Sequence, residues 1–313
     1  MHDTSVVFAF DAKYAKYCAV ALHSVLKHCK SRLNVHCISK DASDDDLARI
    51  KNIADRHQAK ITFHRELKYS FDGWKVTEHF SLATYYRILI PYIVEAERAL
   101  YLDSDLIATC DITPLLNMEL RGNLVAGCAP LGGEFGTKMP THDSDTYLNM
   151  GVVLMDLALL RDGDFLRACG AIHDKYKDRI TWLDQCIINE FAKFRKLILN
   201  PRWNVLVGGR EFPPQERRLD AYLGRVILHG AGPTKPWMEW ADPRVQVIWR
   251  SYAEEVFDSL DEVLQKPSTI GDYMTLAKSL QRQGKYHEAS RVTDDIIRDL
   301  LRQISSLMKK SGA

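Results

Sequence analysis

The sequence predicts an α/β domain with a mainly parallel sheet, followed by a short extension made only of helices. Over about the first two hundred residues, short apolar runs alternate with amphipathic segments, which is typical of strands joined by crossover helices. After about Leu264 the strand-like runs stop and only helical patterns remain. We therefore expect one domain over residues 1–264 and a helical extension over residues 265–313.

The apolar runs predict the strands of the domain in chain order. They are Val6–Phe10, Val35–Ile38, Ile61–Phe63, Ala99–Leu102, Leu124–Cys128, Val152–Met155, Leu197–Leu199 and Val226–Leu228.

Apolar residues at helical spacing predict the helices between these strands. One helix is capped by Ser43, three residues before Asp46, and another is ended by Pro91. The predicted helices are Ala15–His28, the segment after Ser43, Ala83–Ile90, Leu157–Tyr176 and Thr181–Phe194.

The extension has the apolar spacing of one tetratricopeptide-like hairpin, with its turn at Arg282–Lys285. Such a unit cannot bury its own apolar face, because these repeats need about three copies for stability. It therefore docks on the main domain or meets a partner. Ile297, Leu301, Ile304 and Met308 share one face of the last helix, which predicts packing against the domain, with peripheral contact to an anionic membrane surface as the alternative.

The composition excludes several classes of protein. With 42 basic and 41 acidic residues, the net charge is +1, which argues against a nucleic-acid partner. No apolar stretch approaches the roughly 20 residues of a membrane-spanning helix, and the N-terminus lacks the basic start of a signal peptide. Seven cysteines without a C-x-x-C pair favour reduced thiols over disulfides or structural zinc. We expect a cytoplasmic protein.

An acidic pair, Asp103 and Asp105, stands at the carboxyl end of the predicted strand 99–102. Residues i and i+2 of an extended segment project to the same side, so both carboxylates can hold one cation. Ligands of an open α/β sheet bind at this edge. Carboxylate oxygens suit Mg²⁺ or Mn²⁺, and such an ion stabilises a diphosphate leaving group, so the pair predicts cleavage of a bond to phosphate.

The same acidic spacing recurs at three places with ordinary explanations: a first helical turn, a polar loop and a glycine turn. These pairs are, in that order, Asp44/Asp46, Asp143/Asp145 and Asp162/Asp164. Only Asp103/Asp105 is framed by apolar residues on both sides, where two charges without a cation or hydrogen-bond donors would be unstable.

A second polar group, HGAGPTKPW, follows the predicted strand 226–228. His229 can complete the metal shell through a ring nitrogen, which favours Mn²⁺ over Mg²⁺ without deciding between them. Gly230 and Gly232 allow the backbone to approach a ligand, and Lys235 offers a positive charge to a phosphate. An ordinary position at a strand end would explain His229 alone, and an ordinary Gly-Pro turn would explain the residues after it. Because they are adjacent in the sequence, a binding site is favoured.

Further residues have both a functional and a structural interpretation. Asp184 and Gln185 begin an amphipathic helix, where they either face a reacting centre or serve the helix end and the surface. Asn149, just before the predicted strand 152–155, can place an amide for hydrogen bonding, and Arg87 can hold a phosphate or a sugar hydroxyl. The residues alone leave these alternatives open.

Six blocks in order resemble family 8 glycosyltransferases, which include bacterial galactosyl- and glucosyltransferases of lipopolysaccharide synthesis. They are VVFAFDAKYA (6–15), ATYYRI (83–88), YLDSD (101–105), YLNMGVVLMD (147–156), WLDQCIIN (182–189) and HGAGPTKPW (229–237). The resemblance implies the nucleotide-sugar-binding GT-A fold. It also implies a retaining transfer of a hexose, galactose or glucose, from a UDP-sugar to a saccharide, glycolipid or glycoprotein acceptor.

The resemblance also implies roles for individual residues. Mn²⁺ would be bound by Asp103, Asp105 and His229. The UDP part of the donor would be contacted by Ala9, Asp11, Tyr14, Ser104, Gly232 and Lys235. The donor sugar and the reacting centre would be surrounded by Arg87, Asn149, Asp184 and Gln185.

The sequence departs from the family pattern at two blocks. Ala12-Lys13 stand where relatives often carry Asp-Asn, which puts uracil or ribose contacts there in doubt. Cys186 replaces a frequent second acidic residue, so a nucleophile at that position loses support. Residues 131–146 match nothing in the family and are interpreted as a lid over the acceptor site.

Two alternatives belong to other classes. A haloacid-dehalogenase-type phosphatase also uses a strand-end D-x-D, but its motif expects Thr or Val where Ile107 stands and lies closer to the N-terminus. An inactive UDP-sugar-binding adaptor is disfavoured by the full set of Asp103, Asp105, His229 and Lys235.

Overall fold

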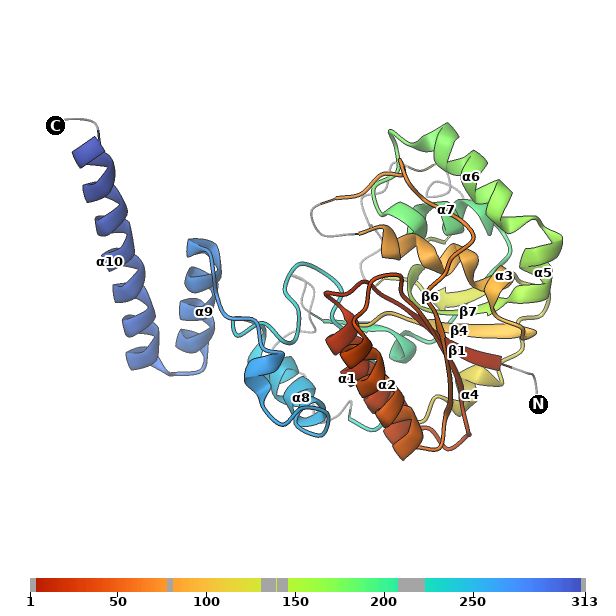
Figure 1. Ribbon diagram of the computed structural model, residues 1–313, viewed down its shortest axis with the longest axis horizontal. Helices are drawn as coiled ribbons and strands as arrows, with labels where there is room; N and C mark the ends of the chain where they lie inside the picture. The colour runs from red at the N-terminus through yellow and green to blue at the C-terminus, as the bar shows by residue number, and fades with distance from the viewer. Residues whose placement is uncertain (1–3, 78–80, 131–138, 140–145, 208–222, 311–313) are drawn as a thin grey trace. The chain divides into compact units, whose positions relative to one another are not determined.

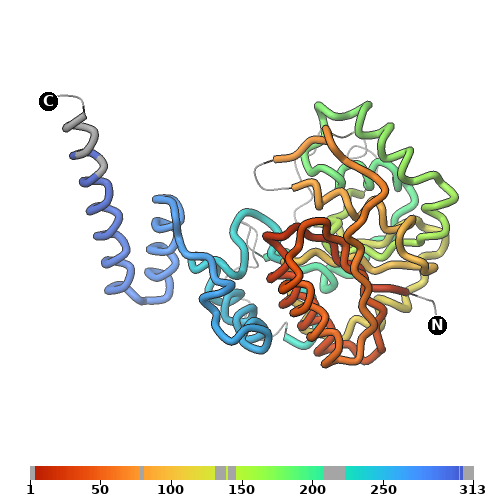
Figure 2. The backbone as a smooth tube through the Cα atoms, in the orientation of Figure 1, coloured from red at the N-terminus to blue at the C-terminus, as the bar shows by residue number. Residues whose placement is uncertain are grey.

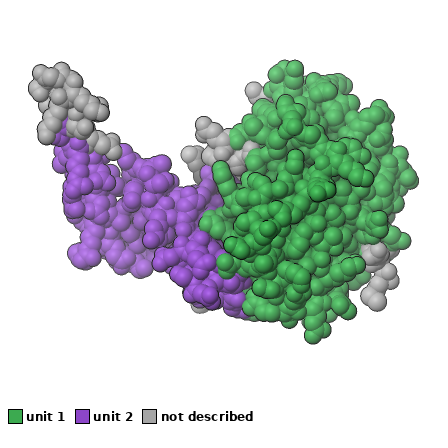
Figure 3. Space-filling view, viewed as in Figure 1, with its two compact units in different colours: residues 1–231 green, residues 232–313 purple. Residues whose placement is uncertain are grey.

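The structure is a computed structural model that describes residues 4–77, 81–130, 139, 146–207 and 223–310. It divides into two compact units, residues 1–231 and 232–313, which Figure 3 distinguishes by colour. The predicted division after residue 264 falls inside the second unit. Apart from Met139 and Thr146, the predicted acceptor lid at 131–146 lies outside the described residues.

The first unit is built on a seven-stranded sheet with the order β3-β2-β1-β4-β7-β6-β8. Only β7 runs antiparallel to its neighbours, so the predicted α/β class with a mainly parallel sheet is confirmed. The strands are β1 (Thr4–Ala9), β2 (Asn34–Ile38), β3 (Lys60–His64), β4 (Arg98–Leu102), β6 (Val125–Cys128), β7 (Asn149–Asp156) and β8 (Lys196–Ile198).

Helices cover both faces of this sheet, as Figure 1 shows. On one face lie α1 (Ala15–His28) and α2 (Asp44–Arg56), the first with the predicted bounds and the second capped by Ser43 as predicted. The other face is packed by residues of η1 (Leu82–Leu89), α3 (Ile90–Ile93), α5 (Leu157–Asp162), α6 (Phe165–Tyr176) and α7 (Leu183–Phe191). The backbone trace in Figure 2 follows this alternation of strands and helices.

Three predicted details are wrong. The predicted helix 83–90 is present as a 3₁₀ helix over residues 82–89, but the helical conformation does not end at Pro91, which lies in the first turn of α3, where its missing N–H breaks no hydrogen bond. The predicted helix 157–176 is two helices, because Asp164 adopts a left-handed conformation (φ +49°) between them. Asn149 is the first residue of β7 rather than a residue before the strand.

A second sheet has the order β5-β10-β9, with β5 at Leu106–Ala108, β9 at Val205–Leu206 and β10 at Ile227–His229. The run at 226–228 predicted β10, whereas β5, of the same length, was not predicted, and the two residues of β9 are too few to carry a periodic pattern. β10 pairs antiparallel with β5 and places His229 opposite Leu106. This pairing joins the segment after Asp105 to a residue far along the chain.

The second unit contains α8 (Pro243–Ala253) and the predicted hairpin of α9 (Ile270–Arg282) and α10 (Tyr286–Lys310). Gly284 turns the chain between the last two with φ +75°. Along α10, Ile297, Leu301 and Ile304 are 51%, 61% and 51% exposed. Among the helices of the described residues, none combines the length and the hydropathy needed to cross a membrane. The remaining short helices are α4 (Thr113–Leu116), η3 (Pro201–Trp203) and η5 (Leu260–Glu262).

Candidate functional site

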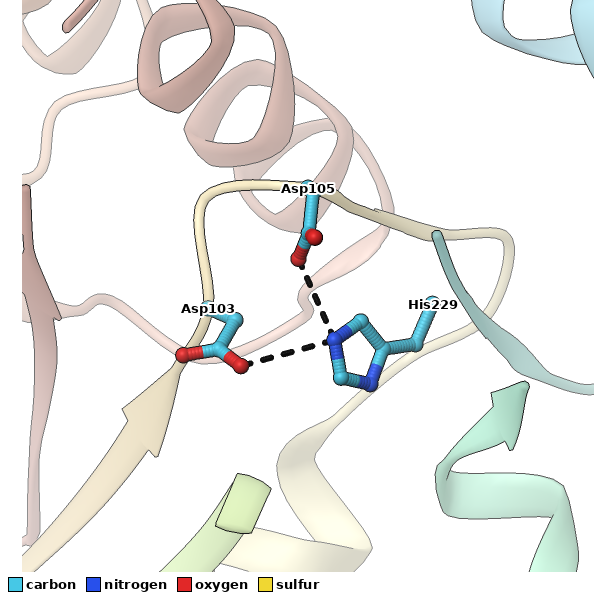
Figure 4. A group of neighbouring side chains, drawn as sticks. All are labelled: Asp103, Asp105 and His229. Carbon is cyan, nitrogen blue, oxygen red and sulfur yellow. Dashed lines mark ion pairs between the residues drawn. The ribbon is translucent and has the colours of Figure 1, made fainter. Parts of the chain in front are cut away.

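Asp103, Asp105 and His229 meet at one point of the first unit, with both carboxylates directed at the same ring nitrogen (Figure 4). His229 Nε2 lies 3.1 Å from Asp105 Oδ1 and 3.4 Å from Asp103 Oδ2. One ligand atom from each residue lies within 4.8 Å of the others, and the described part of the chain holds no second group of this kind. Two carboxylates and an imidazole so arranged suit a divalent cation.

The short strands of the second sheet assemble this group. Asp103 and Asp105 lie in the turn between β4 and β5, and His229 ends β10 beside the start of β5. The Gly230 backbone N–H donates to the Asp105 carbonyl oxygen at 2.8 Å. The Asp103 backbone N–H donates to the Gly151 carbonyl oxygen, also at 2.8 Å. The acidic turn is therefore fixed by backbone hydrogen bonds on both sides.

Gly151 leaves the space that the group occupies. A Cβ atom at this position would lie 2.1 Å from His229 Cε1 and 2.8 Å from Asp103 Oδ2. Any other residue would collide with two of the three candidate ligands, so this glycine is required by a close approach. Two observations therefore support a cation at these residues: the space left by Gly151, and the carboxylate and imidazole atoms that line it.

The Arg87 side chain is buried and is directed at acidic residues. Its Nη2 donates to Asp103 Oδ1 at 3.1 Å, its Nε pairs with Asp184 Oδ2 at 2.7 Å, and its Nη1 donates to the Met150 carbonyl oxygen. The guanidinium stacks 4.3 Å from the ring centroid of Tyr101, whose hydroxyl donates to Asp103 Oδ1 at 2.7 Å. Arg87 thus connects the metal-site carboxylate to Asp184.

The buried charges shift one another's pKa values. Burial acts to lower the pKa of the His229 imidazole, but Asp105 and Asp103 raise it to about 9. Burial acts to raise the pKa of Asp103, but Arg87 and His229 hold it below its usual value. Burial raises the pKa of Asp184 to about 6 against the opposing effect of Arg87. Both aspartates are therefore ionised at neutral pH, while His229 carries a proton when no cation replaces it.

Asp184 and Gln185 occupy the first turn of α7, after Leu183 in a left-handed conformation (φ +43°). Asp184 accepts a hydrogen bond from Thr84 Oγ1 as well as the ion pair with Arg87. Gln185 Oε1 accepts from the Met150 backbone N–H at 3.0 Å, and its Nε2 donates to the Tyr147 hydroxyl at 3.3 Å. The Gln185 side chain is thus held against β7, the strand that also carries Gly151, whereas Asp184 is held by two residues of η1.

The predicted uridine contacts lie at the end of β1. Ala9 ends the strand, and Asp11 Oδ1 accepts from the Tyr14 backbone N–H at 3.1 Å. The Ala12 backbone N–H donates at 3.0 Å to Asp41, a carboxylate that follows β2. Asp41 was missed by the sequence analysis, although its position after a predicted strand was a usable signal.

Ser104 is buried between the two aspartates. Gly232 and Lys235 belong to the second unit, where Gly232 has φ +114° and the Lys235 backbone N–H donates to Met238 Sδ at 3.2 Å. Their assignment to the diphosphate stays a prediction.

Asn204 is a further residue that the sequence analysis missed. It is 5% exposed, and its Oδ1 lies 2.8 Å from His229 Nδ1. A single asparagine in the segment PRWNV gives no sequence signal, because its partner stands 25 residues away in the chain.

Known proteins resemble the chain over this region. Residues 5–241 match the model of glycosyl transferase family 8. A putative glycosyltransferase of Haemophilus influenzae is 26% identical over 239 residues, which span 74% of this chain and 72% of that protein. The lipopolysaccharide 1,2-glucosyltransferase of Escherichia coli is 25% identical over 76% of this chain and 73% of its own length.

Among solved structures, the galactosyltransferase LgtC in complex with donor and acceptor sugar analogs superposes with a TM-score of 0.70 at 25% identity. The match covers 80% of this chain and 95% of LgtC. The GT-A fold that the sequence blocks implied is therefore confirmed. The chain belongs to glycosyltransferase family 8.

Proposed function

We propose that the protein transfers a hexose, galactose or glucose, from a UDP-sugar to a saccharide, glycolipid or glycoprotein acceptor. The observation that carries this proposal is the convergence of Asp103, Asp105 and His229, which would hold a divalent cation. The donor set of two carboxylate oxygens and one imidazole favours Mn²⁺, with Mg²⁺ as the alternative. When bound, such a cation neutralises the donor diphosphate and stabilises UDP as a leaving group.

The comparisons support a hexose donor through the names of the relatives. One relative is a glucosyltransferase acting on lipopolysaccharide, and the solved neighbour LgtC is a galactosyltransferase. The family match also favours sugar transfer over the phosphatase alternative, because it extends over residues 5–241 rather than over the acidic pair alone.

The chain's own residues would act by holding charges in fixed places. Arg87 fixes the carboxylates of Asp103 and Asp184, so neither has to reorganise when the donor arrives. We assign the surroundings of the donor sugar to Asp184, Gln185, Asn149 and Arg87. We assign the UDP part to Ala9, Asp11, Tyr14, Ser104, Gly232 and Lys235.

Substitution of the acidic pair tests this function. Asp103→Asn and Asp105→Asn should each lower cation-dependent UDP release by about a hundredfold or more, because a catalytic metal contributes several kcal/mol to transition-state stabilisation. The measurement is UDP release from UDP-galactose and UDP-glucose with and without Mn²⁺, with circular dichroism as the test of folding. Asp162→Asn, in the exposed D-x-D at the end of α5, is the matched control and should keep wild-type turnover.

Near-normal turnover in either site variant would contradict the role of the acidic pair. Tight UDP binding without turnover of any UDP-sugar by the wild-type protein would instead favour the inactive adaptor. Release of inorganic phosphate from an added phosphate monoester, in the absence of a UDP-sugar, would favour the phosphatase.

A further inference from the structure

We propose that Asn204 is a positioning residue that sets the imidazole of His229 for cation binding, and that Asn149 holds Asn204 in turn. The inference rests on the proposed function, because it assumes that Asp103, Asp105 and His229 hold a cation. It gives Asn204 a role, and it adds a supporting role for Asn149 to the place beside the donor sugar proposed above.

The contact between Asn204 and His229 is buried and short. His229 Nδ1 lies 2.8 Å from Asn204 Oδ1, on the side of the ring opposite the two aspartates. Asn204 Nδ2 donates to Asn149 Oδ1 at 2.7 Å. The three side chains are only 3%, 5% and 7% exposed for His229, Asn204 and Asn149, so water does not substitute freely for these bonds.

A backbone group fixes the direction of every hydrogen bond in this chain of contacts. The Gly151 backbone N–H donates to Asn149 Oδ1 at 2.9 Å, so the atom facing Asn204 is an oxygen and must be an acceptor. Asn204 therefore directs its amide NH₂ at Asn149 and its carbonyl oxygen at His229. His229 must then carry its proton on Nδ1, which leaves Nε2 as the ring nitrogen that can donate a lone pair to a cation.

The contacts close into a ring around the candidate site. Gly151 holds Asn149 through its N–H and Asp103 through its carbonyl oxygen. From Asp103 the ring returns to His229 at 3.4 Å. An asparagine pair needed only to fill the core would not have to connect two candidate ligands, so the arrangement points to positioning of the imidazole.

The test compares two near-isosteric variants by direct cation binding in the absence of any sugar nucleotide. Asn204→Leu removes the acceptor for Nδ1–H and should weaken Mn²⁺ binding by about ten- to a hundredfold, the usual effect of losing such a supporting contact. Asn204→Asp keeps an oxygen toward Nδ1–H but loses the NH₂ that donates to Asn149, so it should weaken Mn²⁺ binding less than Asn204→Leu does, by about threefold at most. Electron paramagnetic resonance of free Mn²⁺ gives the affinity, and circular dichroism identifies folded protein.

Asn189→Leu is the matched control. Asn189 is a fully buried asparagine whose amide bonds the backbone of Leu148, without a contact to His229. This variant should lose stability but keep the Mn²⁺ affinity of its folded fraction. If Asn204→Leu does not fold, Asn204→Ser, whose shorter side chain cannot span the same distance, takes its place.

The outcomes separate the inference from the function on which it rests. Wild-type Mn²⁺ affinity in Asn204→Leu, or an equal loss in Asn204→Leu and Asn204→Asp, would overturn the positioning role alone. A wild-type protein that binds no Mn²⁺ would overturn the proposed cation site, and the inference with it.

Discussion

At the scale of single residues, the candidate site depends on Gly151 having no side chain. Gly151 has no Cβ, and the position of that atom would be 2.1 Å from the His229 ring and 2.8 Å from Asp103. Gly151→Ala should therefore displace the imidazole and lower both Mn²⁺ affinity and sugar transfer by about a hundredfold or more, because a catalytic metal contributes several kcal/mol. Mn²⁺ titration and UDP release measure the two effects.

Gly170→Ala provides the comparison, since a Cβ at Gly170 in α6 meets no atom within 4 Å. That variant should bind Mn²⁺ and transfer sugar as the wild type does. Undiminished Mn²⁺ affinity in Gly151→Ala would mean that the His229 ring can move aside and that the space left by Gly151 is not needed.

The sequence predicted some of these residues and not others for physical reasons. Asp103 and Asp105 were recognisable because two charges between apolar runs at a strand end need a partner. Gly151 gave only a weak signal, a glycine beside a strand pattern. The proposed place of Arg87 beside the donor sugar stays a prediction, and its ion pairs with two aspartates were not predicted, because the sequence does not specify the direction of so long a side chain.

At the scale of elements, prediction succeeded where a pattern spans several turns or alternations. Helix α1 was predicted with its observed bounds, Ala15–His28, because Cys18, Leu22 and Val25 repeat at helical spacing along its length and Cys29 follows directly after it. Strand β9 was missed because its two residues have no room for an alternation. Strand β5 was also missed, although its three residues equal the length of the predicted β10. Those same short strands assemble the candidate metal site.

In the hairpin of α9 and α10, two glycine substitutions should change the free energy of unfolding in opposite directions. Gly284 lies between the helices with φ +75°, a conformation that costs an L-residue about 1–2 kcal/mol, so Gly284→Ala should lower the free energy of unfolding by roughly that amount. Gly271 lies inside α9, and a Cβ there meets only Thr269 Oγ1 at an ordinary 3.6 Å. Because alanine reduces the conformational entropy of the unfolded chain, Gly271→Ala should raise the free energy of unfolding by about 0.4–1 kcal/mol.

Urea denaturation followed by helical circular dichroism measures both changes in the full chain. Shifts of the same sign in the two variants would show that the left-handed turn does not govern the stability of the hairpin.

At the scale of the whole molecule, the sequence predicted the family but not the strand pairing that assembles the candidate site. Six ordered blocks carry the resemblance because each is local in sequence. The metal group depends instead on the pairing of β5 with β10, which brings Leu106 opposite His229 across more than a hundred residues. No spacing in a single sequence specifies such a register, so the sequence pointed to His229 only through its position at a strand end and through the resemblance.

The charges of the assembled site make cation binding depend on pH. Without a cation, Asp105 and Asp103 raise the pKa of His229 to about 9, so Nε2 carries a proton that a cation must displace. Mn²⁺ affinity should therefore rise with pH, by up to about tenfold per unit between pH 6.5 and 9. At pH 7.5 nearly one proton should be released for each Mn²⁺ bound, and Asp184, whose pKa of about 6 leaves it ionised, should add none.

Isothermal titration calorimetry in two buffers of different ionisation enthalpy counts these protons. In the cation-free protein, the protonated form of His229 also contributes to the free energy of unfolding. This contribution is complete below pH 6.5 and is lost as the pH rises through about 9. His173→Gln, which alters a buried histidine stacked on Trp74, should leave the proton release unchanged. Mn²⁺ binding at pH 7.5 without proton release would show that His229 is already neutral, and that the two aspartates do not hold its proton when the cation is absent.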